Sequence, residues 1–241
     1  MTGASSGIGE ASVRALRAEG WTVFAVARRA DRLATLAGET GAMAIPADIA
    51  EDDDVSRLLA RVTDAGGIDT LINIAGGARG ADRVGDASTE DWEWMFRVNV
   101  LGTMKLTRAF LPMLRATGRG TVLNLTSTAG LDAYEGGGGY NAAKFGQHAM
   151  TNALRLEEAE HNLRVIEVAP GLVQTEEFAL NRLGDAQAAG KVYQGVEKPL
   201  TAADVADVVR YAVSAPHHVN LDQIVVRPVA QAATHKLIRK G

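Results

Sequence analysis

Short apolar segments rich in valine and isoleucine alternate along this chain with longer amphipathic segments, and no other feature limits the possible folds so strongly. The short segments have the length and β-branched composition of buried strands, and the longer ones carry apolar residues at helical spacing. Repeated units of strand, helix and strand build a parallel sheet covered by helices on both faces. The sequence therefore predicts an α/β fold with a doubly wound parallel sheet in three layers.

The same pattern gives the expected position of each element. Strands are expected at residues 22–27, 42–47, 70–74, 121–125, 164–169 and 223–227. Helices are expected at residues 8–19, 52–65, 89–115, 140–160 and 202–214. No linker, repeat or low-complexity segment divides residues 1–241, so we expect one domain. The longest irregular stretch, residues 171–200, is expected to act as a lid, because long irregular segments in compact domains are usually functional.

The chain opens with a glycine-rich segment that runs directly into a predicted helix. Gly3, Gly7 and Gly9 lack Cβ atoms, so the main chain can approach an anion, and the N–H groups of the first helical turn point toward it. Their spacing is looser than the Gly-x-Gly-x-x-Gly fingerprint of dinucleotide sites, but it suits the same chemistry. We therefore expect a Rossmann-type sheet with a dinucleotide phosphate bound by Gly3, Ser5, Ser6, Gly7, Ile8 and Gly9.

The strand that should precede this loop is not present in the sequence. In dinucleotide-binding folds the loop follows the first and central strand of the sheet, yet here only Met1 precedes Thr2. We expect the first strand to be missing or truncated at the N-terminus. An incorrectly assigned start is favoured over replacement by vector-derived residues or a sheet that has lost its centre.

Composition excludes several classes of protein. A net charge of -4 and a pI near 5.8 argue against nucleic acid or an anionic membrane as the main partner. The chain has no cysteine, which excludes disulfides and cysteine-based zinc sites, and no His, Asp or Glu group has metal-ligand spacing. No signal segment or membrane-length apolar run is seen, so the expected location is the cytoplasm.

A second group of chemically useful residues lies in the middle of the chain. Ser127 closes a predicted strand, and Tyr140 and Lys144 lie one helical turn apart on one face. A cation at roughly 4 Å, at an effective dielectric of about 20, favours a phenolate by about 4 kcal/mol, or about three pKa units. Lys144 is therefore expected to bring the pKa of Tyr140 close to working pH, and Ser127 to donate a hydrogen bond to the same substrate oxygen.

Together these groups resemble the short-chain dehydrogenase/reductase family, and the resemblance extends over essentially the whole chain. The residues that carry it are Thr2-Gly3-x-x-x-Gly7-x-Gly9, Asn73-Ile74-Ala75-Gly76, Val98-Asn99-Val100-x-Gly102, the segment from Asn124 to Gly130, Tyr140-x-x-x-Lys144 and Pro170-Gly171-x-Val173-x-Thr175. The family has a second Asn where this chain has Ile74.

The resemblance implies a role for each matched residue. Tyr140 would be the general acid in carbonyl reduction and the base in alcohol oxidation, and Ser127 would polarise the substrate oxygen. Lys144 would lower the pKa of Tyr140 and bind the nicotinamide ribose, while Asn99 would support a water that links Lys144 to solvent. The other cofactor contacts would be Asn73, Ala75, Gly76, Pro170, Gly171, Val173 and Thr175.

The end of the second predicted strand indicates which dinucleotide is used. Ala27 stands where an NAD site would place an acid for the ribose hydroxyls, and Arg28 and Arg29 follow it. Guanidinium groups suit a 2′-phosphate as bidentate donors, which favours NADP(H). Asp48 and Ile49, after the third strand, resemble the pair that contacts adenine in the family.

The C-terminal third bears on the substrate. The residues that bear on it are Thr175-Glu176-Glu177-Phe178, Arg182, Val192-Tyr193-Gln194, Ala215-Pro216-His217-His218-Val219-Asn220 and the segment from Ile224 to Gln231. Together they resemble both the NADP-dependent 3-hydroxy acid (serine-type) dehydrogenases and aldehyde reductases such as clavaldehyde reductase, and the two groups share this ending. A carboxylate substrate needs a cation, and Arg182 lies within residues 171–200. The expected substrate is a 3-hydroxy acid or β-hydroxy amino acid, and the alternative is an uncharged aldehyde or ketone.

Two further expectations concern activity and assembly. Some proteins of this fold bind NADP(H) only as sensors or scaffolds, but these tend to lose the Tyr or the Lys, and Ser127, Tyr140 and Lys144 are all present here. The predicted helices 89–115 and 140–160 resemble those through which the family forms homodimers and homotetramers.

Overall fold

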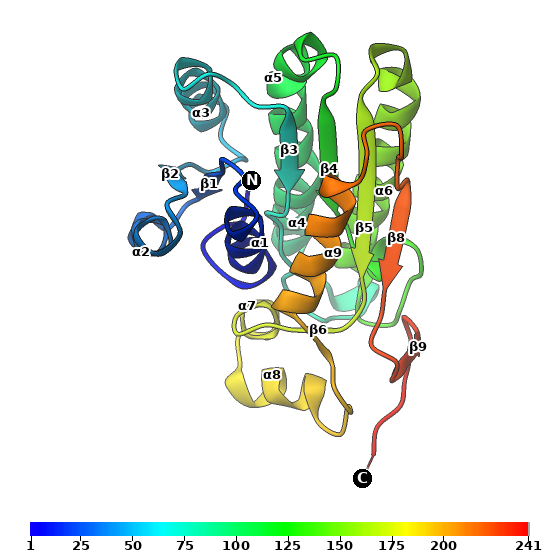
Figure 1. Ribbon diagram of the computed structural model, residues 1–241. Coiled ribbons are helices and arrows are strands. Elements are labelled where there is room, and N and C mark those ends of the chain that lie inside the picture. The colour runs from blue at the N-terminus through cyan, green and yellow to red at the C-terminus, as the bar shows by residue number, and fades with distance from the viewer. Residues whose placement is uncertain (241) are drawn as a thin grey trace.

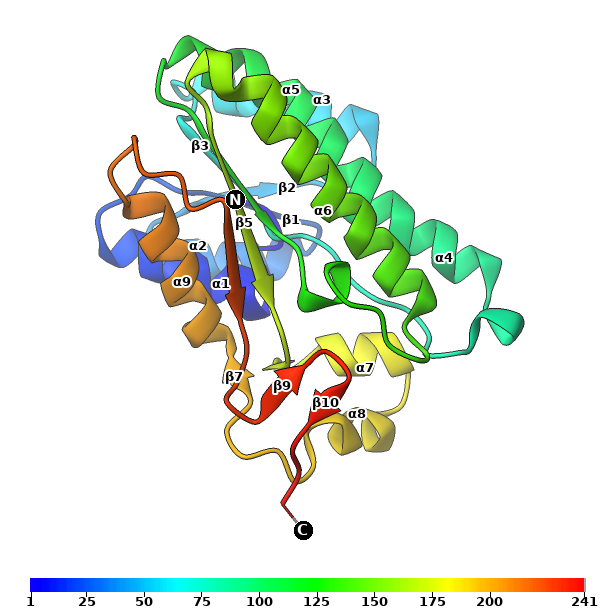
Figure 2. The same cartoon turned by 90° about the vertical axis from the view of Figure 1, so that its right-hand side faces the viewer.

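In the computed structural model, which describes residues 1–240, a parallel sheet lies between two layers of helices (Figure 1). Its strands are β2 (Met43–Pro46) beside β1 (Phe24–Ala27), and then β3 (Thr70–Asn73), β4 (Thr121–Leu125), β5 (Arg164–Pro170) and β8 (Gln223–Val226). One layer holds α1 (Gly7–Ala18), α2 (Ala30–Thr40) and α9 (Ala202–Ser214), and the other holds α3 (Asp52–Asp64), α4 (Thr89–Phe96), α5 (Thr103–Ala116) and α6 (Gly138–Glu158), as Figure 2 shows. The predicted three-layer α/β architecture is confirmed.

Alternation along the central strands divides the core into two halves. In β4, Leu123 packs with the apolar side chains of α1, α2 and α9, whereas Val122 packs with those of α3 and α5. In β5, Ile166 and Val165 are divided between the two halves in the same way. Because successive side chains of a strand point to opposite faces, every residue of a strand covered on both faces is buried, as in β4 and β5, and most of these residues are apolar.

Met1 and Thr2 lie between β1 and β3, where the sequence predicts a truncated strand. The Thr2 N–H donates to the Ile72 carbonyl at 3.0 Å, and the Val26 N–H donates to the Met1 carbonyl at 2.9 Å. Thr2 forms one parallel bridge to Val26. The β1–β2 pair and the β3–β4–β5–β8 group are therefore linked by these few residues rather than by a full strand.

Two helical predictions needed correction. The predicted helix 89–115 is two helices, α4 and α5, joined by a π-helical turn, η2 (Arg97–Gly102). The sequence pattern also predicted no element where α2 lies, because only Leu33 and Leu36 of that helix are buried. The remaining predicted strands and helices are present, with boundaries that differ by at most two residues.

Shorter elements lie at the carboxyl end of the sheet. Residues 171–200 contain β6 (Val173–Gln174), α7 (Phe178–Leu183), α8 (Ala186–Tyr193) and the first residue of β7 (Leu200–Thr201), and Figure 2 shows them beside β9 (Gln231–Ala233) and β10 (Lys236–Leu237). Single helical turns occur at η1 (Val84–Asp86), η3 (Thr128–Gly130) and η4 (Ala159–His161). Within residues 1–240, none of the helices has the length and apolar character that a membrane crossing requires.

Candidate active site

One large cleft lies where the carboxyl ends of the strands meet residues 171–200. Its volume is about 990 Å³, enough for a dinucleotide and a small substrate. The predicted site residues that line it are Gly3, Ser5, Ser6, Gly7, Ile8, Gly9, Arg28, Arg29, Asp48, Ile49, Ala75, Gly76, Ser127, Tyr140, Lys144, Pro170, Gly171, Val173, Thr175 and Arg182. The fold thus brings together predicted phosphate, adenine, nicotinamide and substrate contacts from distant parts of the sequence.

The glycine loop has a conformation that only glycine accommodates. Gly3 and Gly7 have φ angles of +68° and +53°, in the left-handed region that side chains avoid. A Cβ atom on Gly9 would lie 2.1 Å from the carbonyl oxygen of Gly3. Ser6, which precedes α1, makes no side-chain capping bond, so the first N–H groups of the helix face the cleft. This cradle fits the pyrophosphate of a dinucleotide.

The reactive side chains come from β4 and α6. Ser127 lies two residues after the end of β4 and directly before η3, and its Oγ accepts the Ala129 N–H at 3.1 Å. Tyr140 and Lys144 lie in the first turns of α6 and are both buried. The ring of Phe178, from α7, contacts the Tyr140 ring edge-on at 5.7 Å between centroids.

Arg182 also reaches this end of the cleft. Its guanidinium lies 5.8 Å from the centre of the Tyr140 ring. Its Nη1 donates to the Tyr134 hydroxyl at 2.7 Å, and its Nε and Nη2 donate to the carbonyls of Gly80 and Gly136, each at 3.1 Å. A cation is therefore held beside the phenol by three hydrogen bonds to two separate segments.

Two predicted site residues lie outside the cleft lining within residues 1–240. Asn73 is buried beneath the site, where its Nδ2 donates to Thr107 and to Asn124. Asn99 lies in the π-helical turn, and its side chain pairs with the main chain of Gly77, donating to the carbonyl at 2.9 Å and accepting the N–H at 3.1 Å. Asn99 thus fixes Gly77 in the wall of the cleft, whereas Asn73 bonds only to buried residues beneath it.

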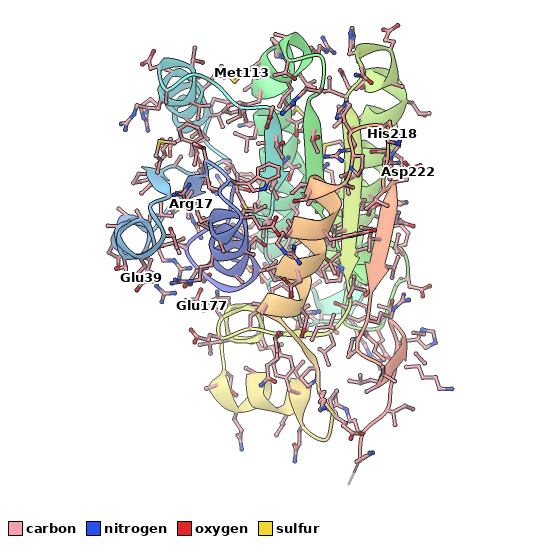
Figure 3. All side chains as sticks on the ribbon, in the orientation of Figure 1. Arg17, Glu39, Met113, Glu177, His218 and Asp222 are labelled. Carbon is pink, nitrogen blue, oxygen red and sulfur yellow. The ribbon has the colours of Figure 1, made fainter. Side chains whose placement is uncertain are left out.

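The two arginines after β1 have different surroundings. The Arg28 side chain is 67% exposed, and its closest charged neighbour is Asp48 at 3.9 Å. The Arg29 guanidinium donates to both carboxylate oxygens of Glu177, at 2.7 and 2.9 Å, and to the hydroxyls of Ser5 and Ser6. Figure 3 shows Glu177 where residues 171–200 meet the end of α1. Arg28 is thus open to a ligand, whereas Arg29 is already paired.

Comparison with known proteins agrees with this site. Residues 1–184 match the family described as short chain dehydrogenase. An uncharacterized oxidoreductase of Mycobacterium tuberculosis is 49% identical over 237 residues, covering 98% of this chain and 92% of that protein. The NADP-dependent 3-hydroxy acid dehydrogenase of Schizosaccharomyces pombe is 34% identical, with 100% and 95% covered. Among solved structures, the closed form of serine dehydrogenase complexed with NADP+ has a TM-score of 0.93 at 34% identity, covering 100% of this chain and 98% of that chain.

The chain belongs to the short-chain dehydrogenase family. It is therefore an oxidoreductase, and the resemblance inferred from the motifs is confirmed. The family assignment also argues against a purely sensing or scaffolding protein, because Ser127, Tyr140 and Lys144 line the same cleft.

The electrostatics of this short-chain dehydrogenase differ from the expectation at one point. The phenol was expected to be acidified directly by the ammonium, but burial raises the pKa of Tyr140, while Ser127 and the charge of Arg182 oppose that rise. Burial also lowers the pKa of Lys144 from 10.5 to about 7, and the Glu167 carboxylate opposes that change. The Lys144 Nζ lies 5.8 Å from the centre of the Tyr140 ring and donates to Gln147 and Leu125 instead. In the protein without a cofactor, the ammonium is thus bonded to Gln147 and Leu125, and its acidification of the phenol stays a prediction.

Sequence reasoning missed some residues of the cleft. One of them is Glu177, although the pair Glu176-Glu177 places two carboxylates within a segment that was expected to be a lid. Arg79 stacks over the Trp94 ring at 4.1 Å, and both line the cleft. No short-range pattern links these residues to the site, because their partners come from other elements.

Proposed function

We propose that this protein is an NADP(H)-dependent dehydrogenase that interconverts a small carbonyl compound and the corresponding alcohol. The observation that carries this proposal is the convergence of Ser127, Tyr140 and Lys144 in a cleft that continues to the glycine cradle of α1. When bound, the nicotinamide accepts or supplies the hydride. The protein supplies the proton and holds the substrate oxygen in place.

The protein's own groups divide the remaining work. The Tyr140 hydroxyl donates a proton to the substrate oxygen during reduction and accepts it during oxidation. The Ser127 hydroxyl donates a hydrogen bond to the same oxygen as negative charge develops on it. Lys144, in its charged form, favours the phenolate of Tyr140 and holds the nicotinamide ribose. Asn99 keeps Gly77 and the neighbouring wall of the cleft in position.

Arg28 is our candidate for recognition of the 2′-phosphate of NADP(H). It is exposed at the rim of the cleft next to Asp48, the proposed adenine contact. A free guanidinium forms bidentate charge-assisted bonds with phosphate, which an NAD(H) ribose cannot accept. The names of the similar S. pombe enzyme and of the serine dehydrogenase complex support the choice of NADP. Loop residues Pro170, Gly171, Val173 and Thr175 would hold the nicotinamide end.

Residues 171–200 would cover the bound cofactor and substrate as a lid within one domain. Glu177 attaches them to the phosphate end of the cleft, because its carboxylate pairs with Arg29 and with Arg32, the latter at 2.5 Å. The Arg29 guanidinium, together with Ser6 and Arg32, lowers the pKa of Glu177 to about 2, so the carboxylate stays charged at any working pH. Arg29 then acts on the cofactor mainly by holding this segment closed.

The first experiment asks whether the phenol carries the proton. Tyr140→Phe is expected to lower kcat by about 10² to 10⁴, because the general acid is lost while the ring still packs against Phe178. NADPH affinity, measured by fluorescence titration, should stay within three-fold of wild type. The assay follows NADPH oxidation with a panel of 3-oxo acids and uncharged aldehydes. A variant that keeps more than a tenth of the wild-type kcat would overturn the proposed function.

For the substrate, we favour a 3-hydroxy acid or a β-hydroxy amino acid. Three of the five N–H groups of Arg182 are bound by Gly80, Tyr134 and Gly136, which leaves two for a carboxylate beside Tyr140. The similar serine and 3-hydroxy acid dehydrogenases have substrates of this class in their names.

The second experiment separates charged from uncharged substrates. Arg182→Ala is expected to raise KM for 3-hydroxy acids at least ten-fold, equivalent to about 1.4 kcal/mol, and to leave KM for an uncharged aldehyde as in wild type. Equal behaviour of the variant toward both substrates would favour the alternative, an uncharged aldehyde or ketone.

Assembly into homodimers or homotetramers is also proposed. Phe96 on α4, Leu101 on η2, and Phe145 and Leu156 on α6 are large apolar side chains exposed on the helices through which the family assembles. Such a surface is costly to leave in water. The absence of cysteine suits the reducing cytoplasm, which we propose as the location.

A further inference from the structure

A polar side chain that the proposed mechanism does not use lies directly behind the reactive lysine. Gln147 follows Lys144 by one helical turn of α6 and is completely buried. The Lys144 Nζ donates to its Oε1 at 2.7 Å and to the Leu125 carbonyl at 3.2 Å. A buried amide is costly unless its polar atoms are bonded, so its presence in the core requires a reason.

The other half of the amide is bonded as well. The Gln147 Nε2 donates to the Thr103 hydroxyl at 3.2 Å, and that hydroxyl donates to the main-chain carbonyl of Asn99 at 2.8 Å. Thr103 is the first residue of α5, directly after the π-helical turn. Lys144 is thus connected to Asn99 through two side chains, at the place where the family resemblance implied a water.

Hydrogen-bond chemistry allows only one orientation of this amide. An ammonium can only donate, so the Gln147 oxygen must face Lys144. The Thr103 hydroxyl already gives its proton to Asn99, so it must accept from the Gln147 nitrogen. Two of the three ammonium N–H groups are then held by Gln147 and Leu125, and the third remains for the cleft that Lys144 lines.

We propose that Gln147 is a positioning residue for Lys144: its carbonyl oxygen holds the ammonium at the wall of the cleft and favours its charged form. This inference rests on the proposed function, because it matters only if a charged Lys144 acidifies Tyr140. Near Lys144, the titratable groups are Tyr140 on α6, Glu167 on β5 and, bonded to Glu167, His148 on α6. Glu167 is itself engaged by His148, Thr126 and Gln223, so Gln147 is the direct side-chain partner.

Gln147→Met tests the proposal, because methionine has a similar length and no strong acceptor. Lys144 should then hold its proton less tightly, so its amine should titrate about one pH unit lower than the wild-type value of about 7. Labelling of Lys144 with an amine-reactive reagent across pH 5–10, followed by mass spectrometry, measures this without a substrate. The acid limb of the pH–rate profile for L-serine oxidation with NADP+ reports the ionisation of Tyr140, the base in this direction. It should move up by about one pH unit, because a less charged Lys144 favours the phenolate less, and KM for NADP+ should stay within two-fold.

Thr151→Val is the matched control. The Thr151 hydroxyl lies in the same buried network and donates to the main-chain carbonyl of Gln147 at 2.8 Å, but it does not touch the amide. This variant should lower the melting temperature and leave the Lys144 titration unchanged. If Gln147→Met lowers only the melting temperature in the same way, Gln147 is merely structural and the proposal fails.

A second variant covers the case in which Gln147→Met does not fold. Thr103→Val keeps the side-chain shape and releases the Gln147 nitrogen, so the Lys144 titration should shift in the same direction by a smaller amount. An unshifted titration in this variant overturns the proposal. Failure of the proposed function gives a different result: Tyr140→Phe would then remain active, independently of how Lys144 titrates in the other variants.

Discussion

The two ends of the cleft bind charge by different physical means. At the catalytic end, Tyr140 and Lys144 are buried, and burial shifts the pKa of each toward its neutral form. At the phosphate end, Arg28 is largely exposed, and Arg29 and Glu177 neutralise one another at the surface of the 171–200 segment. The first end is governed by desolvation and a few fixed hydrogen bonds, and the second by backbone shape and solvated charge.

This difference indicates which changes each end tolerates. Leaving a buried polar group without its partner lowers the stability of the protein by about 1–3 kcal/mol, and by more for a charged group. An exposed ion pair contributes at most about 1 kcal/mol, and its contribution falls as the salt concentration rises. The backbone of the glycine loop belongs to neither class, because its shape depends on close contacts rather than on charge. Three predictions test this division, beginning with the largest expected effect.

Gly9→Ala should have the largest effect at the phosphate end. Its Cβ would lie 2.1 Å from the Gly3 carbonyl oxygen, and since that neighbour is backbone, the loop must open. We expect NADPH affinity, measured by fluorescence titration, to fall more than 100-fold. Gly38→Ala is the control, because nothing lies within 4 Å of its Cβ and alanine should stabilise α2 by about 0.5–1 kcal/mol. Comparable affinities for the two variants would show that charge alone recognises the phosphates.

Lys144→Met should reveal the desolvation at the catalytic end. The pKa of Lys144 is lowered to about 7 in the folded protein and returns toward 10.5 on unfolding, so between these values the unfolded state binds more protons. Wild-type stability should therefore rise, relative to the variant, by about 1.4 kcal/mol per pH unit between pH 7 and 10.5, and not below pH 7. Urea unfolding of both proteins without cofactor at pH 7.5, 8.5 and 9.5 measures this slope. If the free energies of unfolding of the two proteins change with pH in parallel, Lys144 stays charged in the folded protein.

Arg28→Ala and Arg29→Ala should have smaller and distinguishable effects. Loss of Arg28 is expected to weaken NADP(H) binding about ten-fold at low salt and to spare NAD(H), because only the 2′-phosphate is lost as a partner. Loss of Arg29 should weaken both cofactors equally, since it releases Glu177, and Glu177→Gln should reproduce that result. Titrations at two salt concentrations should show the Arg28 effect shrinking as salt rises. A selective loss of NADP(H) in Arg29→Ala would reverse the two assignments.

Prediction from the sequence succeeded where the signal is local and periodic. The strands 121–125 and 164–169 are mostly apolar because both of their faces are covered, and the helix containing Tyr140 and Lys144 follows from its spacing. It failed at α2, which buries only Leu33 and Leu36, and at the π-helical turn, which a continuous helical pattern conceals. The turn changes which groups near Asn99 face the site, and that depends on packing against α6.

The sequence by itself determined the layered α/β architecture, the glycine cradle and the identity of the reactive side chains, because each depends on residues that are close together in the chain. Only the tertiary structure decided which partners those side chains have. Arg29 meets Glu177 across 148 residues, and the Gln147 amide that holds Lys144 meets Thr103 across 44. Such pairs form only when distant helices and strands pack against one another. Burial, and with it the protonation of Tyr140 and Lys144, is likewise a property of the packed core that no short segment contains.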